Sequence, residues 1–294
     1  MFAPAPYMEW AKFRPRPAID LAGSNLLACS LEDLPGAREA MDIAGESPDG
    51  YPPLLEAIAR HSGVGAEQVA SAVGCAGANF LACAALLSPG DEVLVESPNY
   101  DPLPGAARLV GARVTTFERR FEDGYALDPA AVTACLTPRT RVVILSNPHN
   151  PSGVLASQES LKELGRLGET RDFHVLVDEV YRDVVLENRP DTAAHVSERF
   201  VATSSLTKAY GLASLRCGWA IASPAVARAI RRARDVVDGW SPMPADRLSV
   251  VAFRNLPALA ARARRIVEAN SRAVTDFLSG RRDLECASTR ATIA

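Results

Sequence analysis

The sequence has none of the cysteine or histidine patterns that hold metals or build disulfide frameworks. Its six cysteines form no C-x-x-C pair, and its four histidines stand apart with no H-E-x-x-H pattern. The cysteines are at positions 29, 75, 83, 135, 217 and 286. We therefore predict no zinc site, no other bound metal and no disulfide scaffold.

Long apolar runs and a strong charge of one sign are also missing. No run is long enough to span a membrane, and the opening stretch MFAPAPYMEWAKFRPRP lacks the apolar core of a signal peptide. A formal net charge of −3 argues against a nucleic-acid partner. The arginine-rich stretches 228–234 and 262–265 are explained by solvated helix faces. We expect a cytoplasmic protein that binds neither nucleic acid nor membranes.

The sequence does contain a regular alternation of short apolar runs and longer helical stretches. The expected strands are 68–74, 91–97, 112–118, 140–147, 173–179, 199–205 and 217–223. The expected helices among them include 78–87, 102–111, 128–136 and 157–171, the last with Ser157 as N-cap. Strands that are apolar throughout and separated by helices predict an α/β fold, a three-layer α/β/α domain around a mainly parallel sheet.

Both ends of the chain depart from this alternation. We predict that residues 1–40 belong to a smaller α+β domain, that 41–240 form the large domain, and that 241–294 begin the C-terminal part of the small domain. Residues 241–294 read as helix with a break at Pro257, followed by LECAS (284–288), which looks like the start of a strand. Since no partner strand follows it, we expect the chain to be a fragment with a truncated small domain.

Polar residues follow several of the expected strands, at the edge where open parallel sheets bind ligands. The turn GCAGAN (74–79) leaves backbone N–H groups free for an anion, although a tight packing turn explains it equally well. SNPHNPSG (146–153) places Asn147 and Asn150 at a strand exit, where a plain turn is the alternative. Each signal is ambiguous alone, but together they predict one site.

A carboxylate and a lysine complete this edge. Asp178 ends an apolar run and is followed by Tyr181, and an unpaired carboxylate there would be costly to bury. Lys208 lies among small and hydroxyl residues in SSLTKAYGLASLRCGW (204–219), with Arg216 nearby. Desolvation and a second cation lower a lysine pKa and free its lone pair for a Schiff base with a carbonyl, such as the aldehyde of pyridoxal phosphate.

These stretches resemble the fold-type I pyridoxal-phosphate enzymes, specifically the class I/II aminotransferases. SSLTKAYGLASLRCGW is similar to that family's S-x-x-K…R-x-G signature, and NPHNPSG to its N-P-x-N-P-[TS]-G loop. VDEVYRD resembles its D-E-x-Y strand end, and SPGDEVLVESPNY its P-G-D-x-V…P-x-Y stretch. The four motifs occur in the family's order, and the resemblance covers roughly residues 20–294.

The resemblance implies a role for each matching residue. Lys208 would form the Schiff base with pyridoxal 5'-phosphate and then move the substrate proton, and Asp178 would pair with the pyridine nitrogen. The other implied contacts are Tyr181 and Asn150 to the cofactor O3' oxygen, Asn150 also to the substrate carboxylate, Tyr100 to the ring face, and Ser205, Arg216 and the backbone of Ala76 and Gly77 to the phosphate. A core position is the alternative for Tyr100.

The sequence departs from the family pattern in three places. The turn at 75–77 is Cys-Ala-Gly, without the hydroxyl residue that many relatives carry there, so phosphate binding would depend on backbone N–H groups. Gly45 occupies the position where the family often has a tyrosine that reaches the partner subunit's phosphate. The family's arginine for the substrate carboxylate would lie beyond residue 294, which leaves the backbone of Gly23 as a candidate.

The resemblance therefore implies an aminotransferase, active as a homodimer, that moves an amino group between an amino acid and a 2-oxo acid. A pyridoxal-phosphate lyase of the C–S β-lyase type remains an alternative, because transamination and elimination differ only in how bases and leaving groups are placed. A catalytically impaired cofactor-binding fragment is the other alternative.

Overall fold

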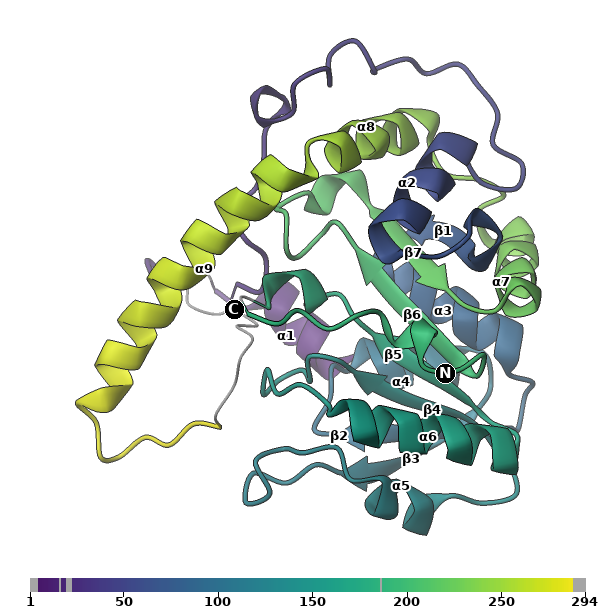
Figure 1. Cartoon of the computed structure of the whole chain (residues 1–294), viewed down its shortest axis with the longest axis vertical. Coiled ribbons are helices and arrows are strands. Elements are labelled where there is room, and N and C mark those ends of the chain that lie inside the picture. Colours follow the sequence, from purple (N-terminus) through teal and green to yellow (C-terminus); the bar gives the residue numbers. More distant parts are fainter. Residues whose placement is uncertain (1–4, 16, 20–22, 186, 288–294) are drawn as a thin grey trace.

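The computed structural model describes residues 5–15, 17–19, 23–185 and 187–287, and centres on a seven-stranded sheet (Figure 1). The strands are β1 (Val69–Val73), β2 (Glu92–Ser97), β3 (Arg113–Glu118), β4 (Thr140–Ser146), β5 (His174–Asp178), β6 (Phe200–Ser205) and β7 (Cys217–Ile221). Each predicted strand is found within two residues of its expected ends.

The strands lie in the order β1-β7-β6-β5-β4-β2-β3. Strands β2 to β6 pair in parallel, whereas β7 runs antiparallel to both β1 and β6. The predicted mainly parallel sheet is thus confirmed. The carboxyl ends of β4, β5 and β6 meet at one edge, which positions the residues that follow them.

Helices cover both faces of the sheet, which explains why the strands are apolar throughout. One face packs against α3 (Gly74–Leu86), α4 (Pro102–Leu109) and α7 (Pro224–Val237). The other packs against α5 (Pro129–Cys135) and α6 (Gln158–Arg171), and around β1 and β7 against α2 (Pro52–Ser62) and α8 (Met243–Arg254). Figure 1 shows α5 and α6 in front of the sheet and the fainter α3 and α4 behind it. The predicted three-layer architecture is confirmed.

Local sequence signals set several helix ends. The Ser157 hydroxyl accepts a hydrogen bond from the Ser160 amide at 2.9 Å, as predicted for an N-cap. Helix α3 begins at Gly74 rather than at residue 78, because Gly74 adopts a φ of +71° that turns the chain directly from β1 into the helix. The small residues of GCAGAN therefore form the first turn of α3.

The predicted break near Pro257 separates α8 from α9 (Leu256–Ser279), since a proline is tolerated only in the first turn of a helix. At the other end of the chain, α1 (Pro6–Phe13) is a separate short helix. The remaining helical turns are η1 (Leu31–Asp33), η2 (Ala66–Gln68), η3 (Arg182–Val184), η4 (Ala193–His195) and η5 (Ala213–Leu215). The division into 1–40, 41–240 and 241–294 stays a prediction.

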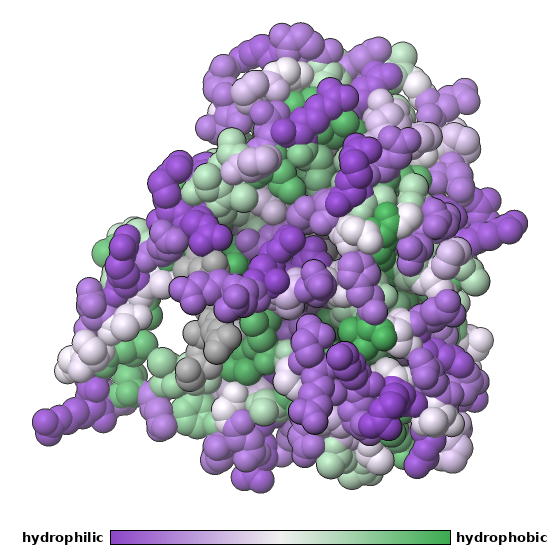
Figure 2. Space-filling view, viewed as in Figure 1, coloured by the Kyte–Doolittle hydropathy of each residue, from purple (hydrophilic) through white to green (hydrophobic). Residues whose placement is uncertain are grey.

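The end of the described chain corrects one expectation. The strand predicted for LECAS is wrong over residues 284–287, which form no strand and are largely exposed, and residue 288 lies outside the described residues. A strand needs a hydrogen-bonded neighbour, and within the described part of the chain no strand pairs with residues 284–287. Before them, α9 extends away from the sheet, and hydrophobic side chains gather along its lower part in Figure 2.

Among the described helices, none combines the length and apolar character needed to cross a membrane. In the same described ranges, no group of three or more His, Cys, Asp or Glu side chains is placed to hold a metal ion.

Candidate active site

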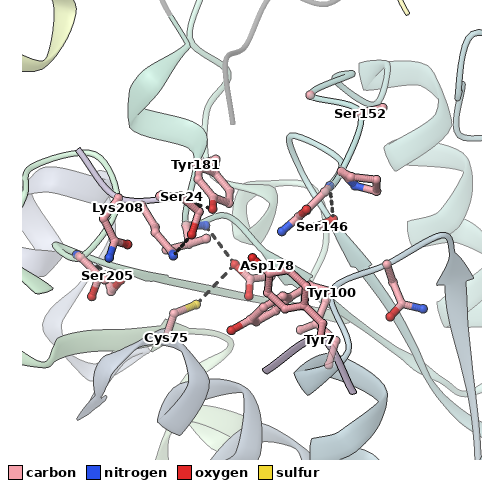
Figure 3. Close-up of a pocket in the computed structure, with 18 of the residues that line it drawn as sticks. Tyr7, Ser24, Cys75, Tyr100, Ser146, Ser152, Asp178, Tyr181, Ser205 and Lys208 are labelled. Atoms are coloured by element: carbon pink, nitrogen blue, oxygen red, sulfur yellow. Dashed lines mark hydrogen bonds between the residues drawn. The ribbon is translucent and has the colours of Figure 1, made fainter. Parts of the chain in front are cut away.

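One pocket of about 1350 Å3 opens where the carboxyl ends of β4, β5 and β6 meet the first turn of α3 (Figure 3). It is larger than a typical drug-sized site, so it has room for a cofactor together with a substrate. Eight residues predicted from the sequence line it: Ala76, Tyr100, Asn150, Asp178, Tyr181, Ser205, Lys208 and Arg216.

Two predicted residues are not among those that line the pocket. Gly77 lies one position further along the first turn of α3. Gly23 is exposed, whereas the next residue, Ser24, does line the pocket. Their roles stay predictions.

Lys208 is a partly buried amine without an acidic partner. Its Nζ donates a hydrogen bond to the Ser24 hydroxyl at 2.7 Å and lies 5.9 Å from the centre of the Tyr181 ring. Lys208 forms no ion pair within the part of the chain that the structure describes. Burial lowers its pKa below 10.5, and Arg216 acts in the same direction, while Asp178 opposes the shift. A larger fraction of this amine is therefore neutral, and nucleophilic, than for an exposed lysine.

Asp178 is a buried carboxylate held by three donors. Its Oδ2 accepts from Asn79 Nδ2 at 2.8 Å, and its Oδ1 accepts from the Val180 amide at 3.0 Å and the Cys75 thiol at 3.4 Å. Burial raises the pKa of Asp178, and these hydrogen bonds, with the charge of Lys208, act against the rise. Figure 3 shows Asp178 and Lys208 directed into the same pocket. The carboxylate is thus available to a positively charged or N–H group of a ligand.

The residue that orients Asp178 has a partner of its own. Asn79 Oδ1 accepts a hydrogen bond from the Thr203 hydroxyl at 2.5 Å, and both residues are buried. This bond fixes the amide so that its NH2 group faces Asp178. Sequence reasoning missed Asn79 and Thr203, because an amide inside a helix and a threonine inside a strand carry no signal of their own.

An anion site is built around Arg216 and the first turn of α3. Arg216 has a φ of +50°, and its carbonyl accepts a hydrogen bond from the Gly74 amide at 2.7 Å. The guanidinium lies so close to Gly74 that a Cβ there would overlap Nη2. Ser205 and Thr207 also line the pocket, and the buried Thr207 hydroxyl has no hydrogen-bond partner among the described residues. A phosphate would supply the acceptors that these donors lack.

Two tyrosines with perturbed pKa values stand over the pocket. Burial, reinforced by Asp178, raises the pKa of Tyr100 to about 12, and its hydroxyl donates to Met8 Sδ at 3.2 Å. Burial also raises the pKa of Tyr181, whose hydroxyl donates to the Ser24 carbonyl at 3.5 Å. Both phenols are protonated at neutral pH and can donate hydrogen bonds to a ligand.

Helix α1 brings further residues to the site. The Tyr7 ring meets the Tyr100 ring edge to face at 5.9 Å, and the Tyr7 amide donates to Asp101 at 2.7 Å. Sequence reasoning missed Tyr7 and Met8, because nothing in the first 40 residues predicts which part of the large domain they contact.

The two asparagines of the 146–153 loop have different roles. Asn150 lines the pocket, and its backbone N–H donates to the Ser146 hydroxyl at 2.8 Å. Asn147 is buried, and its side chain accepts from the Ala156 amide at 3.0 Å. Asn147 therefore stabilises the turn itself, which is the plain reading of an Asn-Pro sequence.

The pocket residues fit pyridoxal 5'-phosphate. Arg216, Ser205, Thr207 and the free N–H groups of α3 provide the anion site, and Asp178 provides the buried carboxylate. Lys208 is the partly neutral amine in the same pocket. A phosphate, a protonated ring nitrogen and an aldehyde on one molecule match these three features.

Replacing Gly74 with alanine tests the anion site. The new Cβ would overlap Nη2 of Arg216 and strain a backbone at φ +71°. We expect the affinity for pyridoxal phosphate to fall about 10- to 100-fold, the loss of one or two charge-assisted hydrogen bonds. Gly105→Ala is the control, since an added Cβ there meets no heavy atom within 4 Å. Absorbance titration measures both variants, and wild-type affinity in Gly74→Ala would contradict this assignment.

Comparisons with known proteins agree with the geometry. Residues 43–293 match the family described as aminotransferase class I and II. The chain is 33% identical over 190 residues to an aspartate/prephenate aminotransferase of Thermus thermophilus, covering 62% of this chain and 49% of that protein. It is 31% identical over 221 residues to an arginine–pyruvate transaminase of Pseudomonas aeruginosa, covering 72% of this chain and 53% of the relative. The chain thus spans about half the length of these relatives.

Solved structures show the same fold. An aspartate aminotransferase from Thermus thermophilus, solved with maleate, matches with a TM-score of 0.84 and 28% identity over 92% of this chain and 74% of that one. An N-succinyldiaminopimelate aminotransferase from Mycobacterium tuberculosis matches with a TM-score of 0.84 and 25% identity over 99% of this chain and 80% of that one.

Proposed function

This chain belongs to the aminotransferase class I and II family, and we propose that it transfers an amino group between an amino acid and a 2-oxo acid with pyridoxal 5'-phosphate as cofactor. The observation that carries the proposal is that Lys208 and Asp178 both line one pocket. The amine has a pKa lowered by burial, and the carboxylate is buried and oriented by hydrogen bonds from Asn79 and Val180. An amine nucleophile and an acidic partner for a ring nitrogen are the two groups that this cofactor requires from a protein.

Different residues of the chain would bind different parts of the cofactor. Arg216, Ser205, Thr207 and the α3 turn would hold the phosphate, with Gly77 contributing a backbone N–H. Asp178 would hold the ring nitrogen, and Tyr100 would lie against the ring face. When bound, the cofactor supplies an aldehyde and an electron-withdrawing ring that stabilises negative charge at the substrate Cα.

Lys208 is the proton carrier of the proposal. In its neutral form, Nζ accepts the proton from the substrate Cα, and in its charged form it returns a proton. The Ser24 hydroxyl, 2.7 Å away, holds Nζ within the pocket. Tyr181 and Asn150 supply hydrogen-bond donors to the oxygen of the ring, and Asn150 also contacts the substrate carboxylate. The backbone of Gly23 is a candidate second contact to that carboxylate.

An amino-acid assay tests the proposed function. The protein is supplied with pyridoxal phosphate, a panel of amino acids and 2-oxoglutarate, and glutamate is measured. Glutamate formation that depends on the acceptor supports transamination. Release of pyruvate and ammonia from cysteine-type substrates without any acceptor would instead show a lyase, and no conversion of any substrate would show an impaired cofactor-binding chain.

A homodimer in the cytoplasm completes the proposal. The end of α7 exposes Val236 (89%) and Val237 (55%), and Trp240 (48%) follows just after the helix. Apolar surface of this kind marks contact sites. Ion pairs from Asp49 to Arg231 and Arg232 bring the segment around Ile43, itself 85% exposed, toward the same helix. The six cysteines are free thiols, which supports a reducing compartment.

Charge placed in this surface is expected to separate the subunits. The double variant Val236→Arg and Trp240→Arg would put two guanidinium groups into the interface, where unpaired charges are costly. Sedimentation velocity is expected to show a dimer for wild type and a monomer for the variant. Gln158→Arg, at an exposed polar position at the start of α6, is the control and should remain dimeric. A monomeric wild-type protein would refute the dimer.

A further inference from the structure

A buried ion pair lies behind the pocket, outside the groups that the proposed reaction uses. Arg119 Nη1 donates to Glu96 Oε2 at 2.9 Å, and neither side chain is exposed to solvent. Such pairs seldom stabilise a protein more than apolar side chains of similar volume, because both charges lose their hydration. Arg119 Nη2 also lacks a hydrogen-bond partner among the described residues. Stability alone therefore does not account for the pair.

The other oxygen of Glu96 is bound to the end of β4. Glu96 Oε1 accepts two hydrogen bonds from Ser146, one from its amide and one from its hydroxyl, both at 2.6 Å. The same Ser146 hydroxyl accepts from the backbone N–H of Asn150 at 2.8 Å (Figure 3). A continuous chain of hydrogen bonds thus runs from Arg119 through Glu96 and Ser146 to Asn150, which lines the pocket.

The 146–153 loop has a second attachment to the end of β2. His149 is buried, and burial, reinforced by the charge of Arg119, lowers its pKa to about 4, so the ring is neutral at pH 7. Its Nε2 lies 2.9 Å from the Pro98 carbonyl, which only accepts, so Nε2 carries the proton. Nδ1 then accepts from the Ser152 hydroxyl at 2.7 Å. The 146–153 loop is thus hydrogen-bonded to the end of β2 at two points, from Ser146 to Glu96 and from His149 to Pro98.

We infer that Glu96 and Ser146 are positioning residues: they hold the backbone at Asn150 and thereby place its side chain in the pocket, with Arg119 as the buried partner of Glu96. Burial raises the pKa of Glu96, and Arg119 and the Ser146 bonds act against that rise. A carboxylate paired with Arg119 accepts both Ser146 bonds strongly, whereas a protonated carboxyl group would carry a hydrogen of its own and accept more weakly. The contribution of this anchor to catalysis rests on the proposed function, since Asn150 would contact cofactor and substrate there.

Hydrogen exchange of the protein without cofactor tests the anchor itself. The Asn150 amide is protected by the Ser146 hydroxyl, so Ser146→Ala is expected to speed exchange in the peptide spanning 147–153 about tenfold. Ser146→Thr retains a hydroxyl and is expected to restore slow exchange. Ser197→Ala, which removes a partly exposed hydroxyl that contacts Glu169 rather than the loop, is the control. Unchanged exchange in Ser146→Ala would overturn the inference.

Removing both charges separates positioning from folding. The double variant Glu96→Leu and Arg119→Leu leaves no unpaired buried charge, so the fold is expected to persist with a thermal midpoint close to that of wild type. Its 147–153 peptide is nevertheless expected to exchange as fast as in Ser146→Ala. A loop that stays protected without Glu96 would overturn the inference.

A double-mutant cycle tests whether Ser146 acts through Asn150. Ser146→Ala alone is expected to lower kcat/KM about tenfold, but less than about twofold when Asn150 is already alanine. Independent, additive losses would overturn the inference. If exchange follows the expected pattern while the wild-type protein transfers no amino group, the proposed function fails and the structural anchor stands.

Discussion

Amino transfer is expected to fall by at least about 10⁴-fold when Lys208 is replaced with alanine, because the variant loses both the nucleophilic amine and the proton carrier. The phosphate contacts remain, so the variant should still bind pyridoxal phosphate reversibly. Its absorbance should be that of the free aldehyde rather than of a lysine-bound cofactor. Turnover is measured with the best amino acid found for wild type.

The sequence offers a matched control for this experiment. It contains three lysines, Lys12, Lys162 and Lys208, and the first two are exposed. Lys162→Ala, on the outer surface of α6, is expected to leave both turnover and absorbance unchanged. Turnover in Lys208→Ala close to that of wild type would show that another group carries the proton.

Replacing Asp178 with asparagine is expected to lower kcat about 10²- to 10³-fold, the usual size of an electrostatic contribution at a buried site. The change keeps the size of the side chain but removes the negative charge that would hold a protonated ring nitrogen. It also introduces an NH2 group beside hydrogen-bond donors. In one orientation this group faces the Asn79 NH2 group, and in the other it faces the Cys75 thiol and the Val180 amide. Steady-state kinetics and cofactor affinity are both measured.

Asp172→Asn is the control for the charge. Asp172 pairs with Arg199 at 2.8 Å on the surface, so its loss should cost little in activity. Asp178→Glu keeps the charge on a longer side chain and should retain more activity than Asp178→Asn. The role of Asp178 would be refuted by an asparagine variant as active as wild type.

Much of this fold follows from simple patterning. Residues Val142–Leu145 and Val175–Val177 are fully buried, and strands covered on both faces must be apolar throughout. The orientation of β7 is not encoded in that pattern, because an apolar run reads the same in either direction. The strand expected for LECAS is wrong over 284–287 for a different reason, since the sequence offered no partner strand for it to pair with.

The site residues were predictable where the chain leaves the sheet. Asp178 ends β5 and Lys208 follows β6, so the topology of a parallel sheet brings them to one edge. Ser24 was not predictable as a partner of Lys208, because the two are 184 residues apart in sequence. Glu96 was hidden for another reason, since a glutamate at the end of a strand normally indicates exposure and here is buried.

The central claim is that Lys208 is the amine that bonds to the cofactor, and one experiment tests it directly. Wild-type protein is mixed with pyridoxal phosphate, reduced with borohydride and digested, and the mass of each lysine peptide is measured. The structure predicts a stable phosphopyridoxyl group on Lys208, which lines the pocket, and none on Lys12 or Lys162, which are exposed and do not line it. A label distributed evenly over the three lysines, or absent from Lys208, would contradict the account.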